Sequence, residues 1–173
     1  MAKTVELRRH TAADGDVLTD EGIRAAVEIG GRLDGDYDVM ITSGAQRATQ
    51  TAACFLAGSG TSASGGVVVD ARFRSNVEDR WKAAYEAAGA GDIESFQKAD
   101  PDLVATESLR FGTALRDVFS RLREGGRALV VGHSPMQEAA VYGLTGEVVE
   151  PLSKGAGIRV VADGGRYSVE PLD

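Results

Sequence analysis

Cysteine and histidine are scarce in this chain of 173 residues, which contains one Cys and two His. A single cysteine excludes an internal disulfide and a cysteine-rich zinc site. No apolar run approaches the roughly 18 residues of a membrane span. Charged side chains at Glu6, Arg8 and Arg9 interrupt the place where a signal peptide needs its apolar segment. We therefore expect a cytoplasmic protein.

Positive charge is in short supply across the whole chain. It has 19 Lys and Arg against 26 Asp and Glu, which gives a formal net charge of −7. Such a chain lacks the positive field that drives sequence-independent binding to nucleic acid or to anionic lipid. We expect neither nucleic acid nor a membrane as a partner, and the length predicts one domain over residues 1–173.

What the sequence does contain is a regular alternation of strands and helices. Strands are predicted at 5–7, 39–42, 67–69 and 128–131, helices from residue 19, over 45–56 and around 111–122, and a hairpin at 157–170. The first helix is expected to bury Ile23, Ala26, Val27, Gly30 and Leu33. Four repeats of strand and helix predict an α/β fold, a three-layer sandwich with a mostly parallel central sheet.

The pattern weakens at about 71–106. Short helical pieces are predicted at 81–88 and 92–99, a Gly-Ala-Gly segment separates them, and Pro101 is expected to interrupt the chain. We interpret this region as a partly helical excursion from the sheet that covers a site.

Polar side chains follow three of the predicted strands. Arg9 and His10 come after the first strand, Arg47 after the second and His133 after the fourth. The carboxyl ends of parallel strands share one edge of a sheet, where such folds bind ligands, so these side chains are expected to converge. Because side chains alternate along a strand, Arg8 and Arg9 point to opposite sides, and we assign Arg9 to the site.

Two imidazoles and two guanidinium groups together favour a tetrahedral dianion. Arginine offers a fixed fork of donors that matches phosphate oxygens, and the positive field needs no metal, so no cofactor or metal is expected. A neutral imidazole in this setting can attack phosphorus. The helix that starts near Ala45 is expected to add backbone N–H donors to the same anion.

Four motifs in the chain resemble those of the histidine phosphatase superfamily, the phosphoglycerate mutase-like proteins. Residues 7–11 (LRRHT) resemble its Arg-His-Gly signature, and residues 42–52 (TSGAQRATQTA) its second signature. Residues 130–134 (VVGHS) resemble its late Gly-His, and residues 18–22 (LTDEG) match its Leu-Thr-x-x-Gly helix opening. The four occur in the family's order.

The resemblance implies a phosphoglycerate mutase-like sandwich and gives each residue a role. His10 is the residue that is transiently phosphorylated, while Arg9, Arg47 and His133 hold the phosphoryl oxygens. Ser43 is expected to help line the site. The short chain is most similar to the small members that act on phosphohistidine proteins or on small phosphoesters.

The chain departs from the family pattern at several positions near the site. Thr11 replaces the usual glycine and adds a side chain beside the nucleophile, and Gly44 replaces the usual proline. No residue in the first loop clearly matches the polar residue with which some relatives contact phosphate. Asp14 and Asp16 would be poor substitutes because their charge repels phosphate.

The general acid is a further departure. In the family a glutamate shortly after the third strand often protonates the leaving oxygen, and Ser75 occupies that position here. The nearest carboxylates are Glu78 and Asp79, and we select Glu78.

The leading hypothesis is a metal-independent phosphatase that acts through a phosphohistidine on His10, with a small phosphorylated substrate or a phosphoprotein as partner. A mutase is the first alternative, in which Arg72, Arg74 and Arg80 are available for a second phosphate. A non-catalytic phosphate-binding module is the second. A mononuclear metal site on His10, His133 and a carboxylate is the last, and the adjacent arginines argue against it because they repel a cation.

Overall fold

The computed structural model describes residues 1–173. Its strands are β1 (Lys3–Arg9), β2 (Ala13–Asp14), β3 (Val17–Leu18), β4 (Val39–Thr42), β5 (Val67–Val69), β6 (Arg127–Gly132), β7 (Gly157–Asp163) and β8 (Arg166–Leu172). Its helices are α1 (Asp20–Arg32), α2 (Gln46–Ser59), the 3-10 turn η1 (Ala71–Phe73), α3 (Glu78–Ala88), α4 (Ile93–Ala99), α5 (Pro101–Arg121) and α6 (Met136–Thr145). None of these helices is both long and apolar enough to cross a lipid bilayer.

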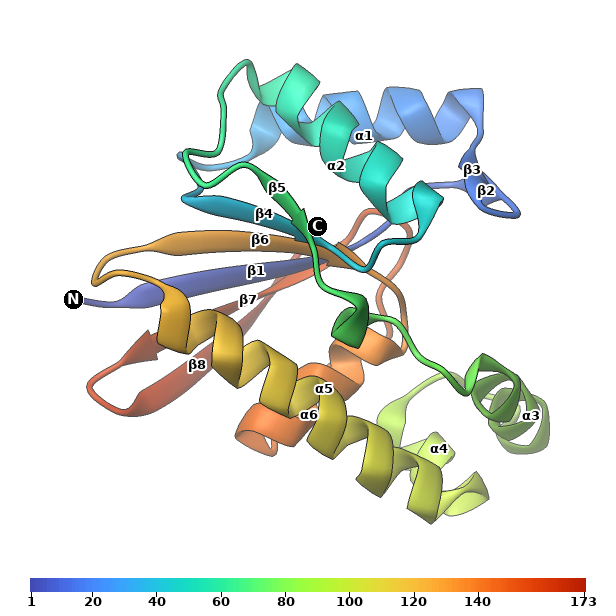
Figure 1. Cartoon of the computed structure of the whole chain (residues 1–173). Coiled ribbons are helices and arrows are strands. Elements are labelled where there is room, and N and C mark those ends of the chain that lie inside the picture. Colours follow the sequence, from blue (N-terminus) through green and yellow to red (C-terminus); the bar gives the residue numbers. More distant parts are fainter.

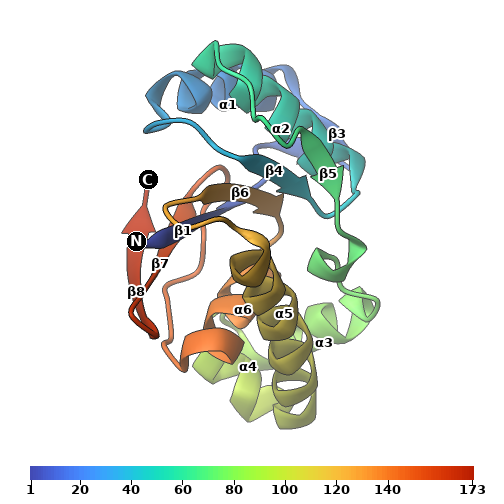
Figure 2. The ribbon, with the colours of Figure 1, turned by 60° about the vertical axis from the view of Figure 1, so that its left-hand side comes forward.

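Six strands form the central sheet in the order β5-β4-β6-β1-β7-β8. The first four are parallel, whereas β7 and β8 form an antiparallel hairpin at one side. Helices α1 and α2 cover one face, and α5 and α6 cover the other, with α3 and α4 beyond them (Figures 1 and 2). This arrangement confirms the predicted three-layer α/β sandwich.

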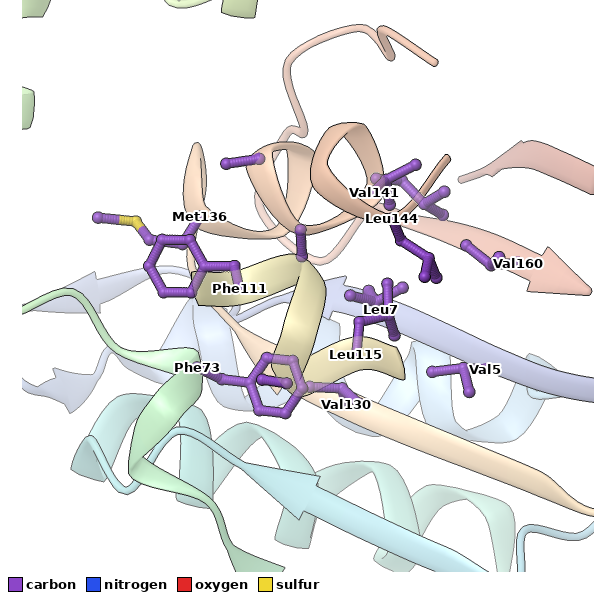
Figure 3. Close-up of a cluster of buried hydrophobic side chains, with 14 of the residues drawn as sticks. Val5, Leu7, Phe73, Phe111, Leu115, Val130, Met136, Val141, Leu144 and Val160 are labelled. Atoms are coloured by element: carbon purple, nitrogen blue, oxygen red, sulfur yellow. The ribbon is translucent and has the colours of Figure 1, made fainter. Parts of the chain in front are cut away.

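Strand β6 shows how the sheet separates two apolar cores. Ala128 and Val130 belong to the cluster under α5 and α6, whereas Leu129 and Val131 belong to the cluster under α1 and α2. All four side chains are fully buried, as expected for a central parallel strand that is covered on both faces. Figure 3 shows Val130 among the side chains of the first cluster.

The prediction for the buried face of α1 is wrong in part. Ile23 and Val27 are each 40% exposed, while Ala26 and Gly30 are buried. The reason is the close contact between α1 and α2: a Cβ added to Gly30 would collide with the backbone of Phe55. Small residues therefore make the closest contact with α2, and Ile23 and Val27 lie on the exposed flank.

Pro101 begins a helix and does not interrupt one. It occupies the first turn of α5, and the Asp100 carboxylate caps that turn by accepting a hydrogen bond from the Leu103 N–H at 3.1 Å. The excursion therefore ends near residue 100, and positions 101–106 belong to α5. Its helices α3 and α4 pack on each other, and α4 packs on α5 (Figure 1).

Candidate active site

The two histidines are brought together by the pairing of β1 with β6. Arg9 and Gly132 are partners at the carboxyl ends of these parallel strands. The His10 N–H continues the ladder by donating to the Gly132 carbonyl at 2.9 Å, and His133 follows directly. The ring centroids of His10 and His133 are 5.4 Å apart, and both rings are buried.

Arg47 joins both imidazoles from the first turn of α2. Its Nε donates to Nε2 of His10 at 3.3 Å, and its Nη2 donates to Nδ1 of His133 at 3.3 Å. The three side chains that follow β1, β4 and β6 thus converge at one edge of the sheet, as the sequence predicts.

The hydrogen bonds define which ring nitrogens carry protons. Nδ1 of His10 lies 2.7 Å from the Thr11 carbonyl, which can only accept, so Nδ1 carries the proton and Nε2 keeps its lone pair. Because Arg47 can only donate, Nδ1 of His133 accepts from it, and Nε2 of His133 donates to Ser43 Oγ at 2.7 Å. His10 therefore presents an unprotonated Nε2 to the site.

Both imidazoles are held neutral. Burial lowers the pKa of His10 to about 4, and the nearby charges of Lys154 and Arg47 act in the same direction. Burial and the Arg47 guanidinium lower the pKa of His133 to about 3. A neutral ring is the form that a nucleophilic histidine requires.

The two adjacent arginines of β1 point to opposite sides, as strand alternation predicts. Arg8 donates to the carbonyls of Gly155 and Asp173, at 3.0 and 2.8 Å, and does not reach the site. Arg9 lines the site, and its Nη1 donates to the Leu152 carbonyl at 2.8 Å. Partial burial of the guanidinium lowers the pKa of Arg9.

A buried carboxyl group next to Arg9 was missed by the sequence reasoning. Glu138 in the first turn of α6 accepts a hydrogen bond from the Ser134 hydroxyl, and its other oxygen, Oε1, is buried with no partner. Burial raises the pKa of Glu138 to about 7. The spacing of Ser134 and Glu138, one helical turn apart, is the only signal in the sequence, and it does not indicate burial.

Asp16 was expected to repel phosphate, but in the structure it caps helix α2 and contacts Arg47. From the turn between β2 and β3, its carboxylate accepts the backbone N–H groups of Gln46 and Arg47, each at 3.2 Å, and the Arg47 Nη1 at 2.9 Å. Ala45, the N-cap residue of α2, has no side chain that can do this. These N–H groups, which we expected to bind the anion, are therefore engaged by Asp16.

A cavity of about 530 Å³ opens over His10 and His133. Its polar end is lined by Arg9, His10, Arg47, His133 and Ser134, and its far end by residues of α3, α4 and the segment 135–152. Glu78 of α3 also lines it, whereas Asp79 and Ser43 do not. The Ser43 hydroxyl is hydrogen-bonded to the His133 ring, and Ser43 does not line the cavity, contrary to the prediction. No group of three or more His, Cys, Asp and Glu side chains is arranged to hold a metal ion.

Residues 3–153 match the sequence profile of the family described as the histidine phosphatase superfamily (branch 1). This match covers most of the chain. The chain belongs to the histidine phosphatase superfamily. No curated protein sequence matches the chain.

Solved structures share the fold of this chain. Phosphoglycerate mutase from Bacillus anthracis str. Sterne has a TM-score of 0.75 at 20% identity, and covers 99% of this chain and 92% of its own. Phosphoserine phosphatase from Entamoeba histolytica, in complex with 3-phosphoglyceric acid, has a TM-score of 0.73 at 16% identity, over 99% and 97%. Mycobacterial glucosyl-3-phosphoglycerate phosphatase has a TM-score of 0.61 at 16% identity, over 99% of both chains. At these identities the likeness shows the fold, and membership of the superfamily supports phosphoryl-transfer chemistry.

Two departures from the superfamily pattern have a local explanation. Gly44 has a φ of 90°, which a proline in its place could not adopt. Thr11 turns its side chain away from the cavity, because its Oγ1 donates to the Gly22 carbonyl at 2.8 Å and its N–H donates to Thr51 Oγ1 at 3.2 Å. The expected side chain beside the nucleophile is therefore directed toward α1 and α2.

Ser75, at the position where the superfamily often has its acidic residue, is part of a structural network. Its hydroxyl donates to Oε1 of the buried Glu107 at 2.5 Å. The same carboxylate accepts from the Trp81 indole at 3.2 Å and from Arg110 at 3.1 Å. Glu107 thus fixes the start of the covering excursion, and Glu78 remains the carboxylate that lines the cavity.

Proposed function

We propose that this chain is a metal-independent phosphatase that hydrolyses a phosphomonoester, or a phosphohistidine, through a phosphohistidine intermediate on His10. The observation that carries the proposal is the unprotonated Nε2 of His10, which lies in one cavity with Arg9, Arg47 and His133. Two guanidinium groups supply the positive charge that phosphoryl transfer demands.

The proposed first step transfers the phosphoryl group to His10. The Nε2 lone pair attacks phosphorus, the ester P–O bond breaks, and the leaving oxygen takes a proton from the Glu78 carboxyl group. Arg9 and Arg47 bind the phosphoryl oxygens, so the Arg47 N–H that donates to His10 turns to an oxygen and frees the lone pair. Water then attacks phosphorus, gives its proton to the Glu78 carboxylate, and releases phosphate and neutral His10.

A mutase would need a second anion site, and the candidate arginines support this alternative poorly. Arg72 is bound by Asp70 and Asp117, at 2.7 and 2.8 Å, and Arg80 is bound by Asp100 at 2.9 Å. Arg74 contacts Glu78 at 3.4 Å. None of these three arginines lines the cavity. This supports hydrolysis of a monophosphate over transfer between two sites on one substrate.

The decisive test uses an aryl phosphate in the presence of a chelator. The protein is expected to release phosphate, and brief incubation with ³²P-labelled substrate is expected to give an acid-labile, base-stable label. His10→Ala should remove both the turnover and the label, whereas Arg24→Ala, an exposed arginine of α1, should keep both. Turnover that survives His10→Ala would contradict the mechanism. Phosphate binding without turnover would instead support a non-catalytic phosphate-binding module.

The assignment of Glu78 as general acid predicts a dependence on the leaving group. Glu78→Gln should slow hydrolysis of an alkyl phosphate about 100-fold or more and change 4-nitrophenyl phosphate hydrolysis little, because only the poor leaving group needs a proton. Asp79→Asn is the matched control, since Asp79 lies next to Glu78 on α3 and does not line the cavity. Equal losses on both substrates, or a larger loss with Asp79→Asn, would contradict the assignment.

A further inference from the structure

Helix α3 faces the cavity with a stripe of side chains, most of which the phosphoryl chemistry does not use. Glu78, Trp81, Lys82 and Tyr85 all line the cavity, and their spacing places them on one side of the helix. Only Glu78 has a place in the proposed reaction. The rest of the stripe lies along the part of the cavity beyond the phosphoryl site.

The wall formed with this stripe is apolar and rigid. Trp81 is 3% exposed, and its indole N–H is fixed by Glu107 at 3.2 Å. Its ring meets Phe96 edge to face, with centroids 5.1 Å apart and planes at 89°. Met136 at the start of α6 and Leu152 line the cavity as well. The hydrogen bond and the ring contact fix the orientation of Trp81, so this part of the wall is preorganised.

Tyr85 stands at the accessible side of this compartment. Tyr85 is 54% exposed, and its ring lies beside Gly91. A Cβ added to Gly91 would lie 3.4 Å from this ring. An exposed aromatic ring that lines a cavity offers a face on which a second ring can stack.

The size and charge of the cavity narrow the ligand further. Its volume of about 530 Å³ lies within the range typical of small-molecule sites, and a phosphoryl group fills only a small part of it. The cavity's guanidinium groups, those of Arg9 and Arg47, lie at the phosphoryl end, and beyond them only Lys82 carries positive charge. A second phosphate has no arginine fork to bind it there.

We propose that this apolar compartment binds the leaving group, and that the substrates are small monophosphates whose alcohol carries an aromatic or branched apolar group. This inference rests on the proposed phosphatase function. Trp81, Phe96, Met136 and Leu152 enclose the apolar group, and Tyr85 closes over it from the accessible side. The compartment selects the substrate, and the residues around His10 carry out the reaction.

The test compares 2-phenylethyl phosphate with ethyl phosphate. Both release a primary alcohol of similar acidity, so the chemical step is matched and only the ring differs. Burial of the ring is expected to raise kcat/KM about tenfold or more for 2-phenylethyl phosphate. Tyr85→Ala should lower the ratio of the two kcat/KM values several-fold, and Tyr85→Phe should leave this ratio unchanged. Leu109→Ala, an exposed side chain of α5 outside the cavity, is the control and should also keep it.

Binding measurements separate this inference from the proposed function. Titration calorimetry with 2-phenylethylphosphonate and ethylphosphonate, which cannot be hydrolysed, is expected to show the same preference in Kd. No turnover combined with a preference for the ring would overturn the phosphatase function and support the compartment. Turnover of both phosphates at equal kcat/KM would overturn the compartment and keep the function.

Discussion

At the scale of single residues, Arg47 and Ser43 determine what the two imidazoles can do. The Arg47 guanidinium donates to both rings, so phosphoryl oxygens compete with the ring nitrogens for the same N–H groups. Ser43 Oγ lies 2.7 Å from Nε2 of His133 and can donate to it or accept from it. When a phosphoryl group binds the Arg47 N–H groups, Nδ1 of His133 no longer accepts from Arg47. His133 can then carry its proton on Nδ1 and donate to a phosphoryl oxygen.

The hydrogen bonds predict opposite tautomers for the two histidines. At pH 7, ¹⁵N-resolved NMR should show His10 protonated at Nδ1 and His133 protonated at Nε2. Because burial lowers their pKa values to about 4 and about 3, neither ring should titrate between pH 8 and 5.5. Saturating inorganic phosphate is expected to move the His133 proton to Nδ1.

The chain contains only two histidines, so the assignment is simple. His10→Ala removes one of the two sets of ring signals and identifies the other. Ser43→Ala should prevent the phosphate-dependent change at His133, because the ring loses the hydroxyl that donates to Nε2. A titration midpoint near 6.5 for either ring, or the same tautomer for both, would contradict this description of the site.

At the scale of elements, helix α2 depends on a cap supplied by another segment. Asp16→Ala removes the acceptor of two backbone N–H groups and of Arg47 Nη1. The free energy of unfolding is expected to fall by about 1 kcal/mol, as for the loss of other helix caps. KM should rise more than kcat falls, because Arg47 loses the contact that orients it toward the cavity.

Asp14→Ala is the matched control for this prediction. Asp14 lies in the same β2–β3 hairpin and is exposed, and its carboxylate does not cap α2. Urea unfolding and steady-state kinetics on an aryl phosphate measure the two effects. If Asp16→Ala lowers KM, then Asp16 competes with phosphate for Arg47 and does not position it.

The same scale explains how far the sequence alone could lead. Apolar runs mark β1, β4 and β6, and parallel strands must end at one edge, so the convergence of His10, Arg47 and His133 followed from elementary geometry. The role of Asp16 could not be predicted in this way. Strands of two residues leave no pattern in the sequence, and the residue that caps α2 lies thirty positions before it. The buried Glu138 depends on the packing of β1 against α6, which no local pattern encodes.

Across the whole molecule, the net charge of −7 contrasts with the positive charge concentrated around His10. Burial keeps both imidazoles neutral, and it is assisted by Lys154, Arg47 and Arg9 at His10 and by Arg47 at His133. The field of these cations is local, so a single phosphoryl group can be attracted while the acidic remainder repels polyanions. Burial of titratable groups at this site lowers the free energy of unfolding when they are ionised, so the stability of the protein depends on pH.

Three buried groups near the site contribute to this dependence in opposing directions. The histidines have pKa values of about 4 and about 3 in the folded state, below the ordinary 6.5, so the unfolded chain binds more protons and stability is lost as pH falls below 6.5. For Glu138 the pKa rises from 4.5 to about 7, so its contribution is fully present below pH 4.5 and is lost as pH rises through 7. Between pH 7 and 5 the two effects partly cancel.

Glu138→Gln should remove the contribution of Glu138 to the pH dependence of stability. At pH 8 the variant is expected to unfold with a free energy higher by a few kcal/mol, at about 1.4 kcal/mol per pKa unit, because a neutral amide replaces a buried charge. At pH 5 most of this difference should be gone, since Glu138 is then protonated in the folded state and the pH is close to its ordinary pKa of 4.5. The variant should therefore lose stability more steeply than the wild type from pH 8 to 5. Urea unfolding at four pH values measures this slope, with the exposed Glu147→Gln as control. Parallel slopes for Glu138→Gln and the wild type would show that Glu138 is ionised in the folded protein at pH 5.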